Sequence, residues 1–127
     1  MTTSAMMYGK TNMKKLFVSV PMKGRTGEEI RASIFKMYCI AETLEGHELE
    51  LVDSFIFEDP ATENKNIAIW YLSKSLEKLS MADVFIGIEN SEQWPGCTIE
   101  KLTAETYGIK CHTVPVDDIL FKFTKEK

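Results

Sequence analysis

The side chain best suited to chemistry is Glu100, which stands four residues after Gly96 in the segment PGCTIE. Gly96 allows a sharp turn from loop into helix, so we expect Glu100 in the first or second helical turn, where the helix dipole favours an ionised carboxylate. An ionised carboxylate in such a position can attack the anomeric carbon of a sugar. Taken alone, however, the pattern is also that of an ordinary glutamate near a helix start, and the residues by themselves favour this plainer interpretation.

A second segment, SVPMKGR, supplies groups that suit a phosphate or the hydroxyls of a ribose. Its serine, its glycine and its two cations precede an expected helix start, where backbone amides attract anions. The segment lacks the spacing of a P-loop. The alternative is a solvated turn whose glycine serves only the backbone angle. The residues predicted to contact a ligand here are Ser19, Pro21, Met22, Lys23, Gly24 and Arg25.

Other reactive or aromatic side chains carry weaker signals. Cys97 lies near the same helix start as Glu100, but no histidine is close in the sequence, so an activated thiolate is the less favoured interpretation. Trp94 lies in a polar loop and is the best candidate to stack on a base. Trp70 and Tyr71 are instead expected to pack against the sheet.

The elements that position these groups follow from periodicity and turn signals. Strands are predicted at residues 15–20, 48–52, 83–88 and 109–114. The first helix is expected to begin with a Thr26–Glu29 capping box and to end at Gly46, with Ile30, Leu44 and the apolar residues between them on one face. A second helix carries Ile69, Leu72, Leu76 and Leu79 at spacings of three and four, and a third runs from Gly96 to about Tyr107. For residues 116–127 no structure is predicted.

This alternation of strands and helices predicts an α/β fold: a flavodoxin- or Rossmann-like three-layer sandwich with a parallel sheet of four to five strands. In such sheets ligands bind outside the carboxyl ends of the strands, where the strand order reverses. That rim comprises residues 19–25, 53–58 and 89–100. Besides the first loop, the residues predicted to bind substrate are Ser54, Phe55, Ser75, Glu89, Trp94 and Gly96.

Composition restricts the class of protein. The 127 residues carry a net charge of −4 and are 44% hydrophobic, which fits one globular domain at residues 15–127 behind a flexible leader at 1–14. The acidic balance argues against a nucleic-acid polymer as partner, and no apolar run approaches the roughly 18 residues of a membrane span. Three widely spaced cysteines and two histidines predict free thiols, a cytoplasmic location and neither a metal site nor a cofactor.

Four segments in collinear order resemble the nucleoside 2-deoxyribosyltransferase superfamily, in particular its small members of uncharacterised function from bacteria and phages. These segments are KLFVSVPMKG, LVDSF, IWYLSKSLEKLSMADV and PGCTIEKLTAETYGIK, and together they extend over residues 15–114. The resemblance implies that Glu100 is the nucleophile that releases the base. It also implies that residues 19–25 hold the sugar or 5′-phosphate, and that the protein is a homo-oligomer.

The chain departs from that family at three positions. Ser75 stands where characterised members have an aspartate that handles the proton of the base, Leu16 where they have a tyrosine, and Lys101 where small members have a histidine. Two functions are therefore expected. The first is cleavage or transfer of the N-glycosidic bond of a nucleoside or nucleotide through Glu100. The alternative is a non-catalytic protein that sequesters a nucleotide or a nucleotide-derived signal, as in phage counter-defence.

Overall fold

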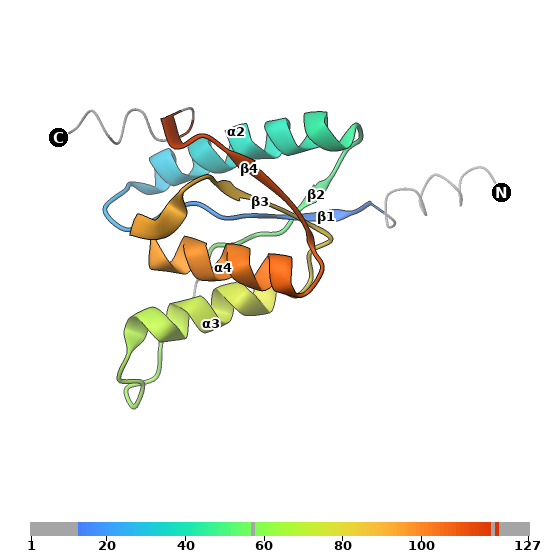
Figure 1. Cartoon of the computed structure of the whole chain (residues 1–127). Helices are drawn as coiled ribbons and strands as arrows, with labels where there is room; N and C mark the ends of the chain where they lie inside the picture. The colour runs from blue at the N-terminus through green and yellow to red at the C-terminus, as the bar shows by residue number, and fades with distance from the viewer. Residues whose placement is uncertain (1–12, 57, 118, 120–127) are drawn as a thin grey trace, which may run out of the picture.

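The computed structural model describes residues 13–56, 58–117 and 119 (Figure 1). Most of the predicted leader, residues 1–12, lies outside the described residues, as do residues 120–127 of the tail. The elements alternate along the chain in the predicted order. They are β1 (Lys15–Val18), α2 (Gly27–Glu45), β2 (Glu50–Leu51), α3 (Ile67–Leu79), β3 (Val84–Ile88), the 3₁₀ helix η1 (Ser91–Gln93), α4 (Pro95–Thr106) and β4 (Lys110–Val114).

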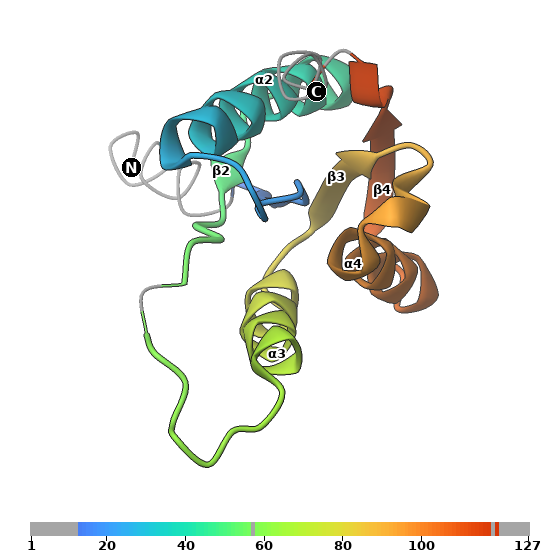
Figure 2. The same cartoon turned by 90° about the vertical axis from the view of Figure 1, so that its left-hand side faces the viewer.

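The predicted fold class is confirmed. Four parallel strands form one sheet in the order β2-β1-β3-β4. Figure 2 views the carboxyl edge of this sheet, with α2 covering one face and α3 and α4 covering the other. Because β1 connects to β2 on one side while β3 and β4 follow on the other, the strand order reverses between β1 and β3. The crevice expected to bind a ligand therefore lies at the carboxyl ends of β1 and β3.

Helix α2 forms as its sequence predicts. The Thr26 hydroxyl accepts from the Glu29 amide at 3.1 Å, and the Glu29 carboxylate accepts from the Thr26 amide at 3.0 Å, which completes the capping box. At the other end Gly46 adopts φ 82°, the left-handed conformation that glycine tolerates best. Leu44, which the spacing assigned to the apolar face, is 54% exposed, so this part of the prediction is wrong and the buried face stops short of the helix end.

Some predicted boundaries and contacts differ from the structure. β2 has two paired residues instead of five, and the expected polar loop before α4 contains η1. Helix α4 begins at Pro95, one residue before Gly96, because proline fits the first helical position without losing a hydrogen bond. Tyr71 is 41% exposed and packs edge to face against Trp70, so its expected packing on the sheet is wrong.

The two faces of the sheet bury cores of different size. The larger cluster lies towards α2 and includes Leu16, Val18, Ile34, Met37 and Ile86. The cluster towards α3 and α4 has four fully buried members, Phe17, Leu79, Phe85 and Ala104. Within it the rings of Phe17 and Phe85 stack with centroids 6.1 Å apart. The layer formed by α3 and α4 is therefore held by fewer buried side chains than the layer formed by α2.

Gly87 leaves the space that the ring of Phe85 occupies. A Cβ at this position would lie 2.8 Å from Cε1 of Phe85, whose side chain is fully buried and has no room to move. The same Cβ would lie 3.7 Å from Cβ of Ser19. Gly87 thus permits close packing directly beneath the carboxyl ends of β1 and β3.

We predict that Gly87→Ala lowers the free energy of unfolding by about 1–3 kcal/mol, because the added methyl group overpacks the Phe85 ring. Chemical denaturation of the wild type and the variant measures this difference. Gly96→Ala is the matched control, because a Cβ there meets no atom within 4 Å and alanine favours a helix. Equal stability of Gly87→Ala and the wild type would contradict the prediction.

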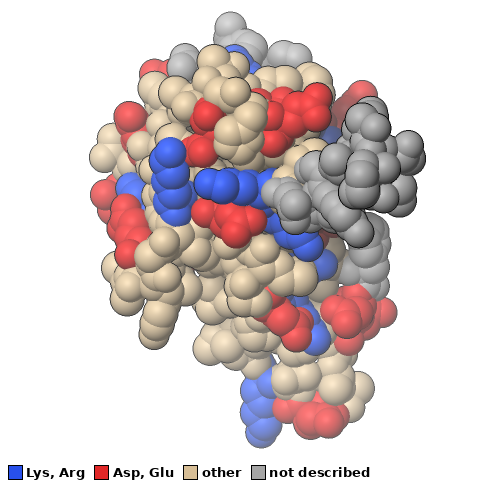
Figure 3. All heavy atoms as spheres, turned by 90° about the vertical axis from the view of Figure 1, so that its right-hand side faces the viewer, with Lys and Arg blue, Asp and Glu red and all other residues tan. Residues whose placement is uncertain are grey.

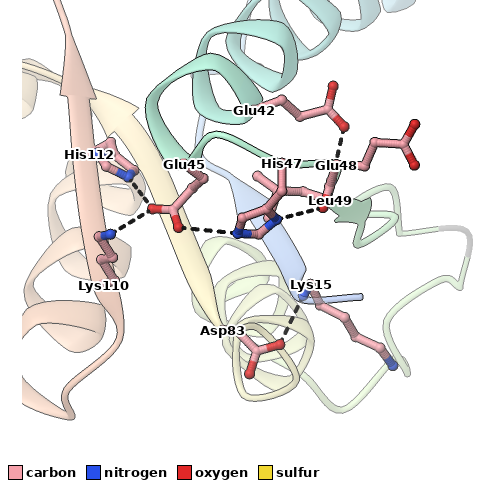
Figure 4. Close-up of polar contacts among 9 residues, drawn as sticks. All are labelled: Lys15, Glu42, Glu45, His47, Glu48, Leu49, Asp83, Lys110 and His112. Atoms are coloured by element: carbon pink, nitrogen blue, oxygen red, sulfur yellow. Dashed lines mark hydrogen bonds and ion pairs between the residues drawn. The ribbon is translucent and has the colours of Figure 1, made fainter. Parts of the chain in front are cut away.

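A polar cluster ties the end of α2 to the start of β4, as Figure 4 shows. The Glu45 carboxylate, 4% exposed, accepts from Nε2 of His112 at 2.6 Å and lies 3.1 Å from Nζ of Lys110. Nε2 of His47 lies 3.8 Å from its other oxygen. The hydrogen bond from His112 is the main reason why the pKa of Glu45 lies below its ordinary value. On the side of the molecule where α2 ends and β4 begins, acidic and basic side chains are interspersed (Figure 3).

Because the pKa of Glu45 is lowered in the folded protein, its contribution to stability is present above the ordinary pKa of about 4.5 and is lost as the pH falls through the folded value. We expect Glu45→Gln to lower the free energy of unfolding by about 1 kcal/mol at neutral pH and by less in acid. Urea titrations at several pH values measure both differences. Glu48→Gln, at an exposed neighbour, serves as control, and a pH-independent effect of Glu45→Gln would contradict the assignment.

Candidate functional site

Three side chains from three elements meet at the carboxyl edge of the sheet. The Ser19 hydroxyl, directly after β1, donates to Oε1 of Glu100 at 2.6 Å, and the Ser75 hydroxyl on α3 donates to Oε2 at 2.5 Å. Glu100 lies in the second turn of α4 and is 9% exposed. The structure therefore brings together the predicted catalytic residue and two of the predicted substrate-binding residues.

The backbone explains why Ser19 reaches this position. Its amide donates to the Ile86 carbonyl at 2.9 Å, so the pairing of β1 with β3 continues one residue past the strand. Side chains alternate along a strand, and Ser19 therefore points to the same face as Phe17, towards α3 and α4. Gly87 on β3 leaves the space beside it open. The site thus lies on the α3 and α4 side of the point where the strand order reverses.

Burial controls the protonation of Glu100. Desolvation raises the pKa of this carboxyl, and the hydrogen bonds from Ser19 and Ser75 lower it by less. The expectation that the helix dipole would favour the ionised form is therefore not met, because the effect of burial on the pKa of Glu100 outweighs that of the dipole. A carboxyl group with a raised pKa can be held protonated and then ionise within a range of pH useful for catalysis.

The Cys97 thiol lies beside this carboxyl group and is buried. Desolvation raises its pKa to about 12, although a hydrogen bond with Ser19 acts in the opposite direction. A thiol with this pKa stays protonated at neutral pH and is a poor nucleophile. The less favoured interpretation of Cys97 as an activated thiolate is therefore wrong for this environment.

The loop after Ser19 is an exposed turn. The Arg25 amide donates to the Met22 carbonyl at 3.2 Å, and Gly24 supplies the φ of 77° that this turn needs. Met22, Lys23 and Gly24 are exposed beside the sheet edge, whereas Pro21 is buried. A ligand at the carboxyl end of β1 could therefore meet the lysine and the backbone of the turn.

The Arg25 side chain serves the turn itself. Its guanidinium group donates to the Pro21 carbonyl at 3.0 Å and to the Ser33 hydroxyl at 2.7 Å. Burial lowers the pKa of Arg25, while the charge of Glu29 raises it by less. These contacts hold the loop against α2, so the position of Arg25 fits a residue that shapes the turn better than one that reaches for a ligand.

The remaining predicted residues lie on the same rim, and of these Gly96 shares helix α4 with Glu100. Phe55 and Trp94 pack against the cluster on the α2 side of the sheet, and Ser54 is buried after β2. Glu89 is exposed, and its amide donates to the Val114 carbonyl at 2.9 Å. Gly96 has no positive φ, so the expected sharp turn at this glycine is not observed, and Asn90 holds the left-handed φ of 56° instead.

Sequence reasoning missed a hollow on the outer side of β2. It has a volume of about 340 Å³ and lies between α2 and residues 51–55. Its lining is mainly apolar and includes Phe35, Tyr38, Leu51 and Phe55. Arg31, Phe35 and Tyr38 follow one another at spacings of four and three, a helical signal that was obscured by the stronger buried face of the same helix.

In the described part of the chain, no three His, Cys, Asp or Glu side chains lie together as a metal site requires. The same residues include no helix with the length and apolarity needed to cross a membrane. Comparison with protein-family models, curated proteins and solved structures gave no match. The functional argument therefore depends on the geometry of the site.

We predict that Glu100→Gln stabilises the fold at neutral to alkaline pH. Since the pKa of Glu100 is raised in the folded protein, the cost of burying its charge is absent in acid and grows as the pH rises through the folded value. The gain in free energy of unfolding should therefore shrink towards about pH 4, near the ordinary pKa. Denaturation at several pH values measures it, with exposed Glu105→Gln on the same helix as control. A variant less stable than the wild type at every pH would refute this account.

Proposed function

We propose that this protein binds a nucleoside or nucleotide at the carboxyl edge of its sheet and cleaves or transfers the N-glycosidic bond through Glu100. The observation that carries the proposal is the buried Glu100 carboxyl group, whose two oxygens accept from the Ser19 and Ser75 hydroxyls where the strand order reverses. Parallel α/β sheets bind their ligands at this place. A carboxylate is also the nucleophile that many glycosyl-transferring sites use.

The reaction follows from the chemistry of a carboxylate. In its ionised form Glu100 attacks the anomeric carbon of the sugar, the carbon–nitrogen bond breaks, and the base leaves with the bonding electrons and takes up a proton. Water or the nitrogen of a second base then attacks the same carbon and releases the sugar from the ester. The two serine hydroxyls offset part of the cost of the ionised form, because they donate to both oxygens.

The neighbouring loops supply the proposed binding groups. Lys23 and the exposed turn at residues 22–24 suit a 5′-phosphate or the sugar hydroxyls. Trp94 and Phe55, both half-buried on the rim, suit the faces of a base. We further propose that the protein acts in the cytoplasm as a homo-oligomer and has no nucleic-acid polymer as its partner.

A specific observation favours a second candidate function, a protein that binds a nucleotide or nucleotide-derived signal without turning it over. In the described residues the side chains that donate to the Glu100 carboxyl are serines, and a serine hydroxyl does not give up its proton at neutral pH. Without an acid that protonates the leaving base, the reaction loses a factor of about 10²–10⁴ in rate. Tight binding with little turnover would then be the function.

To test the proposal, the pure protein is incubated with nucleosides, nucleoside 5′-monophosphates and cyclic ADP-ribose-type nucleotides, and free base is measured by chromatography. We expect the wild type to release base from at least one class, and we expect Glu100→Gln to lower the rate by at least about 10³-fold, because the nucleophile is lost. Exposed Glu105→Gln on the same helix is the matched control and should retain wild-type activity.

Recovery of bound ligands after denaturation separates the two candidates. A ligand that leaves solution and is recovered intact supports the sequestering protein and contradicts glycosidic cleavage. Release of base by Glu100→Gln at the wild-type rate contradicts the role of Glu100. If no ligand in the panel is bound or cleaved, both candidate functions fail.

A further inference from the structure

The outer side of β2 presents backbone groups that can pair with another strand. Two amides point inwards. The Glu50 amide donates to the carbonyl of Lys14, directly before β1, and the Val52 amide donates to the carbonyl of Leu16 on β1, each at 2.8 Å. Because backbone groups alternate between the two sides of a strand, the N–H and C=O groups of Leu51 point away from the sheet. For Leu51, the described part of the chain provides no hydrogen-bond partner on that side.

Two side chains of α2, Tyr38 and Glu42, cover this edge at Leu49. The Leu49 carbonyl accepts from the Tyr38 hydroxyl at 2.9 Å, and the Leu49 amide donates to Oε2 of Glu42 at 2.9 Å, a contact seen in Figure 4. Past Leu49 the strand borders the hollow of about 340 Å³. The side chains of Phe35 and Leu51 line this hollow and are 66% and 41% exposed.

The side of α2 that faces this edge has a self-complementary order of charges. Arg31, Phe35, Tyr38 and Glu42 follow at spacings of four, three and four, so they form one stripe along the helix. A cation stands at one end of the stripe, an anion at the other and two aromatic rings between them. When such a stripe meets a second copy of itself in antiparallel orientation, each cation faces an anion and the rings face each other.

We propose that two copies of this chain pair through β2, antiparallel about a two-fold axis near Leu51, and form one continuous eight-stranded sheet. In this arrangement the Leu51 N–H and C=O groups of the two copies bond to each other, as in a hydrogen-bonded antiparallel pair. Both α2 helices then lie on the same face of the joined sheet. The exposed side chains of Phe35 and Leu51 fill the two facing hollows, and Arg31 of each copy faces Glu42 of the other.

The alignment of β2 with α2 supports a second copy of this chain as the partner. The Leu51 side chain points towards α2, because it is in register with Leu16, a member of the α2-side core. It therefore lies beside Phe35 and Tyr38, the middle of the stripe. One two-fold axis can therefore pass through the middle of both β2 and the stripe, as a two-fold interface requires. An unrelated peptide, in contrast, would not need the ends of the stripe to carry opposite charges.

The test is the mass of the full-length protein in solution by sedimentation equilibrium over a range of micromolar concentrations. We expect a monomer–dimer equilibrium. Leu51→Pro should raise its dissociation constant by at least about tenfold, because proline removes the outward N–H group and leaves the bonds to β1 intact. Phe35→Lys, on the exposed stripe, should do the same. In the wild type, amide exchange at Leu51 should slow as the concentration rises.

Leu102→Lys on α4 is the matched control, because Leu102 is 60% exposed, close to the 66% of Phe35, and α4 covers the face of the sheet opposite to α2. It should leave the dissociation constant unchanged. Circular dichroism and thermal unfolding confirm that each variant is folded, and a misfolded Leu51→Pro leaves Phe35→Lys to decide. A wild type that stays monomeric at the highest concentration overturns the proposal. A dimer that Leu102→Lys dissociates, or that survives Phe35→Lys unchanged, overturns it as well.

Discussion

The hydrogen bonds of the buried Glu100 carboxyl group join three elements, the end of β1, α3 and α4. A carboxyl group removed from water needs hydrogen-bond partners, and here the partners come from the end of β1 and from α3. Helix α3 has one fully buried side chain, Leu79, in its last turn. The bond from Ser75 to Glu100 therefore fixes the middle of α3 against α4, and the site itself contributes to holding this layer in place.

The difference between the two layers has a consequence for function. The core towards α2 is large and contains most of the buried aliphatic side chains, whereas four fully buried residues form the core towards α3 and α4. Regions with few buried apolar contacts open at lower free energy than the rest of a domain. The candidate site thus belongs to the layer that can adjust to a ligand, while the sheet and α2 provide a rigid support for Ser19.

The sequence was sufficient to predict the fold because each signal was local. The Thr26 capping box, the left-handed Gly46 and the buried run at residues 84–88 all depend on neighbours in the chain. The sequence also singled out Ser19, Ser75 and Glu100, but it treated Glu100 as a nucleophile and the two serines as separate ligand contacts. That two hydroxyls bond to the same carboxyl group depends on how α3 and α4 pack, and spacing along the chain does not contain that information. The protonation of Glu100 was misjudged for the same reason, since burial outweighs the helix dipole.

The site and the proposed dimer surface are connected by a short segment. The Phe55 amide donates to Oδ1 of Asp53 at 3.0 Å, which ends the extended run after β2 and turns Ser54 and Phe55 onto the rim. Phe55 lines the hollow beside Leu51 and also packs against the core below the rim. Pairing of two copies through β2 would therefore order the segment that carries a proposed base contact. On this view the dimer would affect ligand affinity through Phe55, while the chemistry at Glu100, across the sheet, would depend on the monomer alone.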